Sequence, residues 1–158
     1  MNNNVYEIVI SLGSNDRQES NMALAKQLLE QLFSDIRFTD SVWTNPVGIE
    51  SDKFLNCLAI AHSKHREPQI KSALKRVQIR CGDTRAFRSI NIVRMDIDIL
   101  LFDGKRQHAE DWQRPYIKNL MKEIKHFRVE AKRAERAKEA DKEKKAKRAD
   151  KAKKAKKK

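Results

Sequence analysis

The sequence predicts an α+β fold for residues 1–128 and, after it, a charged segment that joins no core. Up to residue 128, stretches rich in β-branched residues alternate with stretches whose apolar residues recur at helical spacing. Beyond that point the chain is built almost entirely from Ala, Lys, Arg, Glu and Asp. Alanines without larger apolar partners cannot form a buried face. We therefore expect one domain, residues 1–128, and a solvated tail, residues 129–158, that is either helical or disordered.

The first half of the domain predicts a strand, a helix and two more strands. Residues 5–12 (VYEIVISL) are rich in β-branched side chains and stop at the turn cluster Gly13-Ser14-Asn15. Residues 21–33 repeat apolar side chains at helical spacing. Residues 36–42 alternate loosely and end before Asn45-Pro46, where the residue before proline is pushed out of the helical region. Residues 54–61 (FLNCLAIA) form the next apolar strand.

The second half predicts one more helix and one more strand. Glu67-Pro68 opens a helix with proline in its first turn, and Gly82 is a plausible stop. Residues 95–102 (MDIDILLF) form the last strand, which ends at the turn pair Asp103-Gly104. The order is that of a ferredoxin-like βαββαβ sandwich with helices on one face of the sheet. A final helix could pack on the domain through Trp112, Pro115, Tyr116, Leu120, Ile124 and Phe127.

Charge is distributed unevenly along the chain. The net charge is +13, and residues 129–158 carry 15 Lys/Arg against 6 Asp/Glu, so residues 1–128 carry only +4. The two cysteines, Cys57 and Cys81, show neither CxxC spacing nor a disulfide framework. The amino terminus lacks the pattern of a signal peptide, and no apolar run reaches membrane-spanning length. We expect a reduced, cytoplasmic monomer without a transmembrane segment.

The triplet Asp96-Ile97-Asp98 is the most informative local feature. On a strand, residues i and i+2 point to the same face, so both carboxylates project together while Ile97 faces the core. Side-by-side carboxylates repel unless a cation lies between them, and oxygen ligands are what Mg²⁺ requires. The alternative is an ordinary solvent-facing strand.

Two further groups of residues could serve a ligand. Arg85, Arg88 and Arg94 lie close to the carboxylate pair, where guanidinium groups could neutralise a transferred phosphoryl group, or they form a solvated surface. The loop TNPVG precedes Phe54-Leu55-Asn56, and an aromatic face beside an amide suits a flat, nitrogen-rich ring. We assign no chemistry to the histidines, which show no metal-ligand spacing: His62, His65, His108 and His126.

These motifs together resemble one enzyme family. SLGSN, TNPVG, FLN and VRMDIDILLF follow one another at separations similar to those of 6-hydroxymethyl-7,8-dihydropterin pyrophosphokinases of folate biosynthesis. The resemblance covers residues 5–117. It implies the ferredoxin-like fold and Mg²⁺-dependent transfer of pyrophosphate from ATP to the pterin, with two Mg²⁺ ions. The site residues it implies are Asp96 and Asp98 for metal; Thr44, Val47, Phe54 and Asn56 for the pterin, with Phe54 stacked on the ring; Arg85, Arg88, Ile99 and Tyr116 for ATP; and Arg85 and Arg94 for catalysis.

The chain departs from the family pattern mainly at charged positions. Gln78 replaces a usual Glu, Asp83 a usual Arg, and Val93 the Arg three residues before the first metal ligand. The usual Pro-His-Tyr reads Arg114-Pro115-Tyr116, without the histidine. An alternative function is therefore that of a relative which binds pterin or nucleotide without efficient catalysis.

A second alternative is a basic nucleic-acid-binding module. The βαββαβ order is shared with RNA-recognition domains, but FLNCLAIA lacks their interleaved stacking aromatics. The tail could contact nucleic acid or another anionic surface without sequence preference.

Overall fold

The computed structural model describes residues 3–157, in which one antiparallel sheet packs with helices. The strands are β1 (Tyr6–Ser14), β2 (Ile36–Phe38), β3 (Val42–Thr44), β4 (Phe54–Ser63), β5 (Asp96–Phe102) and β6 (Lys105–Arg106). The helices are α1 (Gln18–Leu32), α2 (Glu67–Arg80), α3 (Arg85–Ser89), the 3₁₀ helix η1 (Asp111–Gln113) and α4 (Pro115–Lys156). The strand order is β2-β4-β1-β5-β6, and β3 also pairs with β4. The predicted α+β class is confirmed.

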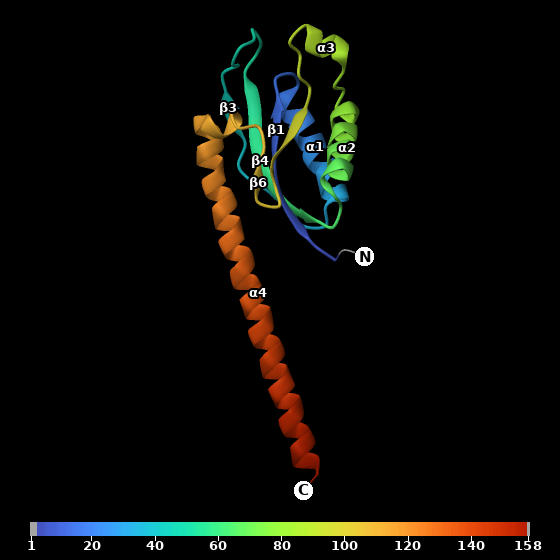
Figure 1. The fold of residues 1–158 in the computed structure, drawn as a ribbon, viewed down its shortest axis with the longest axis vertical. Helices are drawn as coiled ribbons and strands as arrows, with labels where there is room; N and C mark the ends of the chain where they lie inside the picture. The colour runs from blue at the N-terminus through green and yellow to red at the C-terminus, as the bar shows by residue number, and fades with distance from the viewer. Residues whose placement is uncertain (1–2, 158) are drawn as a thin grey trace. The chain divides into compact units, whose positions relative to one another are not determined.

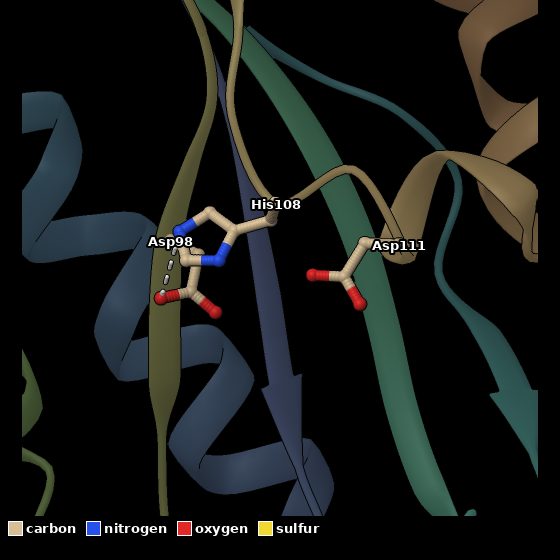
Figure 2. Close-up of side chains that lie close together, drawn as sticks. All are labelled: Asp98, His108 and Asp111. Atoms are coloured by element: carbon tan, nitrogen blue, oxygen red, sulfur yellow. Dashed lines mark ion pairs between the residues drawn. The ribbon is translucent and has the colours of Figure 1, made fainter.

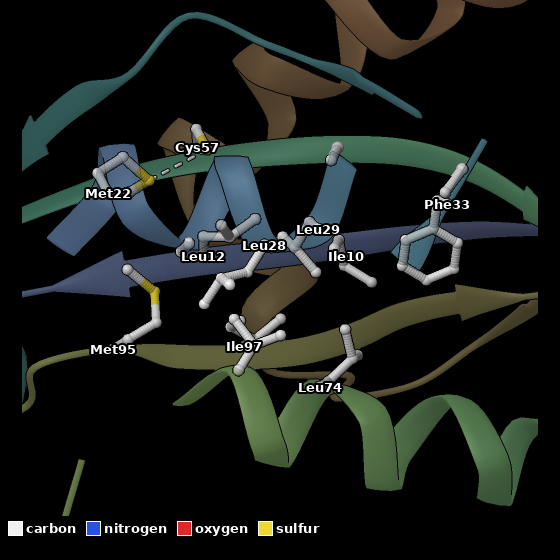
Figure 3. Packing of buried hydrophobic residues seen from close by; sticks show 14 of the residues in the cluster. Ile10, Leu12, Met22, Leu28, Leu29, Phe33, Cys57, Leu74, Met95 and Ile97 are labelled. Carbon is white, nitrogen blue, oxygen red and sulfur yellow. Dashed lines mark hydrogen bonds between the residues drawn. The ribbon is translucent and has the colours of Figure 1, made fainter. Parts of the chain in front are cut away.

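The main core lies between the sheet and the helices α1 and α2 (Figures 1 and 3). Alternate residues of β1, such as Ile8, Ile10 and Leu12, point into it and are at most 1% exposed. Leu29 of α1 and Leu74 of α2 meet them from the helical side. Burial of this continuous apolar cluster is the dominant favourable term that holds the helices on the sheet.

The other face of the sheet is buried as well. Val9, Leu58 and Leu100 point away from the main core and are fully buried. The first turns of α4 bury Ile117 and Ile124, and the carboxylate of Glu123 accepts a hydrogen bond from the Asp40 amide at 3.2 Å. By its internal contacts the chain divides into two compact units, Met1–Ile124 and Lys125–Lys158. Most of the second unit is the rest of α4, which ends at Lys156. Of the two alternatives predicted for the tail, helical or disordered, the structure therefore shows the helix.

The structure corrects several predicted boundaries. The first helix begins at Gln18 instead of residue 21, β4 runs to Ser63 instead of residue 61, and two further strands differ as follows. The strand predicted to stop before Gly13 runs to Ser14, because Gly13 and Ser14 pair with Asn56 and Leu55 of β4. The strand predicted over residues 36–42 is two short strands. Thr39 separates them: its amide donates to the Leu58 carbonyl, and its hydroxyl accepts from the Leu58 amide, both at 2.9 Å. A side-chain hydroxyl thus takes the place of a regular strand partner.

Both cysteines are buried as free thiols. Burial raises the pKa of the Cys57 thiol to about 11, and burial also raises the pKa of Cys81. Since the thiolate is the reactive form, native protein at pH 8 is expected to react only slowly with Ellman's reagent. Unfolding in guanidinium should expose both thiols to rapid reaction. Fast labelling of native protein, measured by absorbance, would contradict this burial.

Candidate active site

The centre of the site is a row of three residues on neighbouring strands. Gly13 of β1 pairs with Asn56 of β4 on one side and with Asp96 of β5 on the other. A Cβ atom at Gly13 would lie 2.9 Å from Oδ1 of Asn56 and 3.6 Å from Phe54. The absence of a side chain therefore keeps the floor open between the amide on β4 and the carboxylate on β5.

A pocket of about 250 Å³ lies over this row. Its lining joins the residues predicted for ring binding with those predicted for metal binding: Thr44, Val47, Phe54, Asn56, Asp96 and Asp98. Arg88 and Tyr116, predicted to contact ATP, line it as well, together with Arg114. A larger hollow of about 520 Å³, with Leu32, His65 and Arg76 in its wall, has no carboxylate in its lining. Of these two hollows, the pocket over Gly13 is the one with chemistry for both a ring and a cation.

The ring side of the pocket is fixed by the Asn56 amide. Asn56 is 5% exposed, and its Nδ2 donates to Oγ1 of Thr44 at 2.7 Å. Thr44 pairs with Phe54 across β3 and β4, which places the aromatic ring at the same end of the sheet. Val47 lies on the following loop and is 72% exposed. The arrangement provides an oriented amide next to an aromatic face.

The cation side consists of the adjacent carboxylates of Asp96 and Asp98 and, nearby, that of Asp111; Figure 2 shows Asp98 and Asp111 together with His108. Asp96 and Asp98 point to the pocket, whereas Ile97 and Ile99 between and after them are buried in the core. Burial, and then the charge of Asp96, raises the pKa of Asp98 to about 6. Nε2 of His108 lies 3.9 Å from Oδ1 of Asp98. The raised pKa of Asp98 follows mainly from burial, whereas the neighbouring Asp96 carboxylate has Nη2 of Arg88 at 3.1 Å.

Two residues beyond β6 complete this cluster. Ligand atoms of Asp98, His108 and Asp111 all lie within 4.8 Å of one another, close enough to hold one metal ion after small adjustments. His108 has a φ of 55° in the loop before η1, and Asp111 opens η1 itself. Asp111 also pairs with Arg114, whose Nε lies 3.3 Å from Oδ1. Two carboxylates and one imidazole from separate parts of the chain thus come close enough to share one metal ion.

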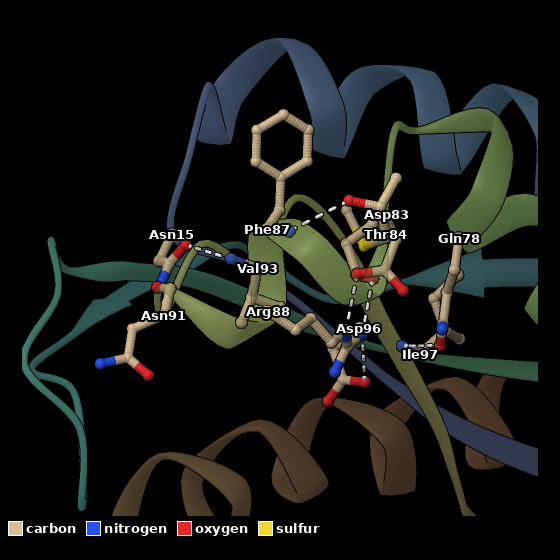
Figure 4. A network of polar contacts seen from close by, with 11 residues as sticks. Asn15, Gln78, Asp83, Thr84, Phe87, Arg88, Asn91, Val93, Asp96 and Ile97 are labelled. Carbon is tan, nitrogen blue, oxygen red and sulfur yellow. Dashed lines mark hydrogen bonds and ion pairs between the residues drawn. The ribbon is translucent and has the colours of Figure 1, made fainter.

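The arginines predicted near the carboxylates take different places, and Figure 4 shows the contacts of Arg88 with Asp83 and Asp96. Nε of Arg88 is 2.7 Å from Oδ1 of Asp83, and its Nη2 is 3.1 Å from Oδ1 of Asp96. Arg94 instead pairs with Asp16 at 3.3 Å, and its guanidinium lies 4.3 Å from the centre of the Phe87 ring. In the described chain, neither Arg94 nor the exposed Arg85 lines the pocket.

The loop between α3 and β5 is fastened by Asn15. The backbone amide of Asn15 donates to the Val93 carbonyl at 2.9 Å, and the side-chain Oδ1 of Asn15 accepts from the backbone amide of Val93 at 2.7 Å. Its Nδ2 also donates to the Asn91 carbonyl at 2.7 Å. Val93, held in this way, lines the pocket, while the next side chain, Arg94, turns toward Asp16. Gln78 serves the backbone instead: its Oε1 accepts from the Ile97 amide at 2.8 Å.

Several residues of the site were not found by sequence reasoning. His108, Asp111 and Arg114 lie in a segment without periodicity, and the spacing of the histidines gave no signal. Gly13 was interpreted as a turn residue, although its place inside β1 opens the pocket floor. Ile99, predicted near ATP, is 3% exposed in the core, so only its backbone is left to meet a ligand.

Comparison with known proteins identifies the family of the chain. The family model for 7,8-dihydro-6-hydroxymethylpterin-pyrophosphokinase matches residues 9–148, most of the chain. The chain belongs to this family. Its members are pyrophosphokinases of folate biosynthesis that use ATP and Mg²⁺, so family membership confirms the predicted resemblance. No curated protein matches the chain as a relative. Across residues 3–157, no helix has the length and apolar character needed to cross a lipid bilayer.

Proposed function

We propose that this pyrophosphokinase homologue binds 6-hydroxymethyl-7,8-dihydropterin over Gly13 and transfers pyrophosphate to it from ATP with the help of Mg²⁺. One observation carries the proposal: a single pocket is lined by the aromatic–amide group of β4 and by the carboxylate pair of β5. A ring held against Phe54 and Asn56 would have its hydroxymethyl group directed along the row toward Asp96. Holding the two reactants in this relation lowers the entropic part of the barrier.

The residues present fit a divalent cation. Asp96 and Asp98 offer the oxygen ligands that Mg²⁺ prefers. The pKa of Asp98 is raised, first by burial and then by the charge of Asp96, so a cation bound beside it would favour the ionised form. Bound there, Mg²⁺ would neutralise charge on the ATP phosphates during transfer. We propose Asp96 and Asp98 as the ligands of two such ions.

The chain's own groups then have distinct tasks. The hydroxymethyl oxygen forms a bond to the β-phosphorus of ATP, the bond from that phosphorus to the α-phosphate oxygen breaks, and AMP leaves. The hydroxyl proton passes to solvent. Arg88 and Arg114, both lining the pocket, supply positive charge to the polyphosphate, and Tyr116 offers a phenol. Burial raises the pKa of Tyr116, so that phenol stays protonated and can donate a hydrogen bond.

The proposed activity is tested by incubating the full chain with ATP, Mg²⁺ and the hydroxymethylpterin and measuring AMP by chromatography. AMP that forms only when both ATP and the pterin are present supports transfer. Pterin fluorescence titrations run in parallel measure binding separately. Absence of both binding and AMP would refute the proposal.

A second function is favoured by the arginine geometry. Arg88 is engaged by two carboxylates, and Arg94 is directed to Asp16 instead of the pocket. Loss of one preorganised charge typically costs about 10²–10³-fold in rate. Measurable pterin binding without AMP would therefore identify a pterin-binding relative that does not catalyse efficiently.

His108 is expected to affect the choice of metal. Imidazole is a better ligand for transition metals than for Mg²⁺, which prefers oxygen. His108→Ala should therefore weaken Mn²⁺ binding roughly tenfold, a scale typical for loss of one metal-site partner, with little effect on Mg²⁺. Calorimetric titration of each metal measures both affinities. The matched control is His126→Ala. It removes a histidine of α4 whose Nε2 lies 2.9 Å from Oε1 of Glu130, outside the pocket lining. Equal losses for both metals would exclude a role for His108 in selectivity.

A further inference from the structure

The net positive charge of the tail comes from its last part, residues 142–158. Residues 129–141 contain four basic and four acidic side chains, so this segment, called the neutral segment below, has no net charge. Residues 142–158, the basic segment, contain eleven Lys/Arg and only two acidic residues, Glu143 and Asp150. The whole net charge of +9 in residues 129–158 therefore belongs to the basic segment.

The basic segment is helical to Lys156 and presents its charges on every side. All residues from 131 to 157 are exposed. Alanine recurs every third residue at 131, 134, 137 and 140, and again at 146, 149, 152 and 155. Because an α-helix has 3.6 residues per turn, each alanine is displaced by about 60° from the one before, and the series winds around the helix. No apolar stripe forms, and the lysines between the alanines surround the axis.

This surface suits one class of ligand, a polyanion of high and regular charge density. An amphipathic helix that lies on a lipid bilayer needs an apolar face, which the winding alanines do not provide. Binding to single-stranded nucleic acid relies on stacking against aromatic side chains, and residues 129–158 contain none. Double-stranded nucleic acid carries a negative charge about every 1.7 Å along its axis and requires neither feature.

The acidic side chains of the basic segment leave most of its lysines available. Asp150 pairs with Lys154 at 3.2 Å, four residues along the helix, and both side chains are more than 60% exposed. Exposed ion pairs of this kind contribute little, so a phosphate can compete for the lysine. Residues 142–156 extend for about 22 Å, long enough to follow several phosphates along a groove.

From these observations, we propose that residues 142–158 bind double-stranded nucleic acid through its phosphate backbone, without sequence preference. This binding is separate from the pterin pocket, which lies in the other compact unit. With about five phosphate contacts, the logarithm of the affinity should fall with the logarithm of salt concentration with a slope of about −4.5. Affinity would then drop on the order of 10²–10³-fold between about 50 and 200 mM salt.

The test compares two full-length variants that lose the same charge at different places. One carries Lys151→Gln, Lys153→Gln, Lys154→Gln and Lys156→Gln in the basic segment. The matched control carries Lys132→Gln, Arg133→Gln, Arg136→Gln and Lys138→Gln in the neutral segment. Each variant lowers the net charge from +13 to +9, and Gln is a good helix former. Circular dichroism confirms helix content, and fluorescence anisotropy measures binding to a labelled DNA duplex of about 20 base pairs over a range of salt.

The proposal predicts a loss of about 30-fold or more at low salt for the first variant, with a salt slope smaller by about two to three. The control should stay within about threefold of the unmodified chain. Equal losses in the two variants would show that only total charge matters and would overturn the assignment to residues 142–158. Preference for the single strand, or binding to phosphatidylglycerol vesicles but not to the duplex, would also overturn it.

Discussion

Asp98→Asn is expected to lower the rate of AMP formation by about 10³-fold or more, because it removes a preorganised charge and a proposed metal ligand together. The side chain lines the pocket opposite the ring-binding residues and lies next to Asp96 and His108. Asparagine keeps the shape of the carboxylate but cannot neutralise a cation. The rate is measured as AMP released at saturating ATP, Mg²⁺ and pterin. Pterin affinity, which depends on β4, should change little.

The same substitution should make the protein more stable, not less. Asp98 has its pKa raised to about 6 in the folded state from 3.8, so folding disfavours the ionised form. A raised carboxyl pKa means that stability declines as pH rises from about 4 to 6 and stays lower above that range. Asp98→Asn removes this cost, so thermal unfolding without metal should occur at a higher temperature than in the unmodified chain at pH 8. At pH 3 the difference should vanish.

A matched substitution distinguishes chemistry from a general loss of charge. Asp103→Asn changes an exposed aspartate in the turn after β5, where φ is 48° and asparagine is well accommodated. It should leave AMP formation unchanged. If Asp98→Asn retained full activity, the carboxylate pair would not be the cation site, and the proposed function would lose its main support.

Val93→Arg is expected to raise the rate of AMP formation by about 10²-fold, the scale of one preorganised charge in a phosphoryl-transfer site. Val93 lines the pocket three residues before β5 begins at Asp96, at the position where the resemblance implies an arginine. Asn15 forms hydrogen bonds with both the carbonyl and the amide of Val93, so the backbone that would carry the new side chain is fixed. Single-turnover measurements would show whether the gain lies in the chemical step.

Two controls accompany this substitution. Val93→Gln adds length without charge and should give no gain. Arg94→Gln should leave AMP formation nearly unchanged, because Arg94 contacts Asp16 and Phe87 instead of the pocket. It should lower stability by roughly 1 kcal/mol through loss of the cation–π contact. A large loss of activity in Arg94→Gln would instead assign Arg94 to the phosphate site.

The elements that follow a regular period could be predicted from the sequence. The alternation in DIDILLF correctly placed Asp96 and Asp98 on one face and Ile97 and Ile99 on the other. The helical spacing of residues 21–33 correctly gave the buried face of α1 at Met22, Ala25, Leu28 and Leu29, whereas Leu32, predicted on the same face, is 45% exposed. Apart from Leu32, local periodicity and tertiary burial agree in both cases, which is why pattern alone was sufficient.

The remaining parts depend on tertiary contacts that leave no periodic trace. Thr39 interrupts the strand predicted over residues 36–42 because its hydroxyl reaches the Leu58 amide, a distant partner. His108 itself has a positive φ, and this backbone conformation directs its side chain toward Asp98. The spacing of residues in the sequence does not encode such a direction. The direction of Arg94 follows from its two partners, Asp16 and Phe87, which lie far apart in the sequence.

The position of β1 between β4 and β5 places the ring-binding residues and the carboxylate pair on different strands. Under the proposed function, β4 would recognise the ring and β5 would control the phosphates, with Gly13 of β1 between them. Substitutions on and before β5 can therefore erode turnover while ligand selectivity on β4 persists. An enzyme built in this way can evolve into a receptor for its former substrate by changes along one flanking strand, and the reverse path is equally short.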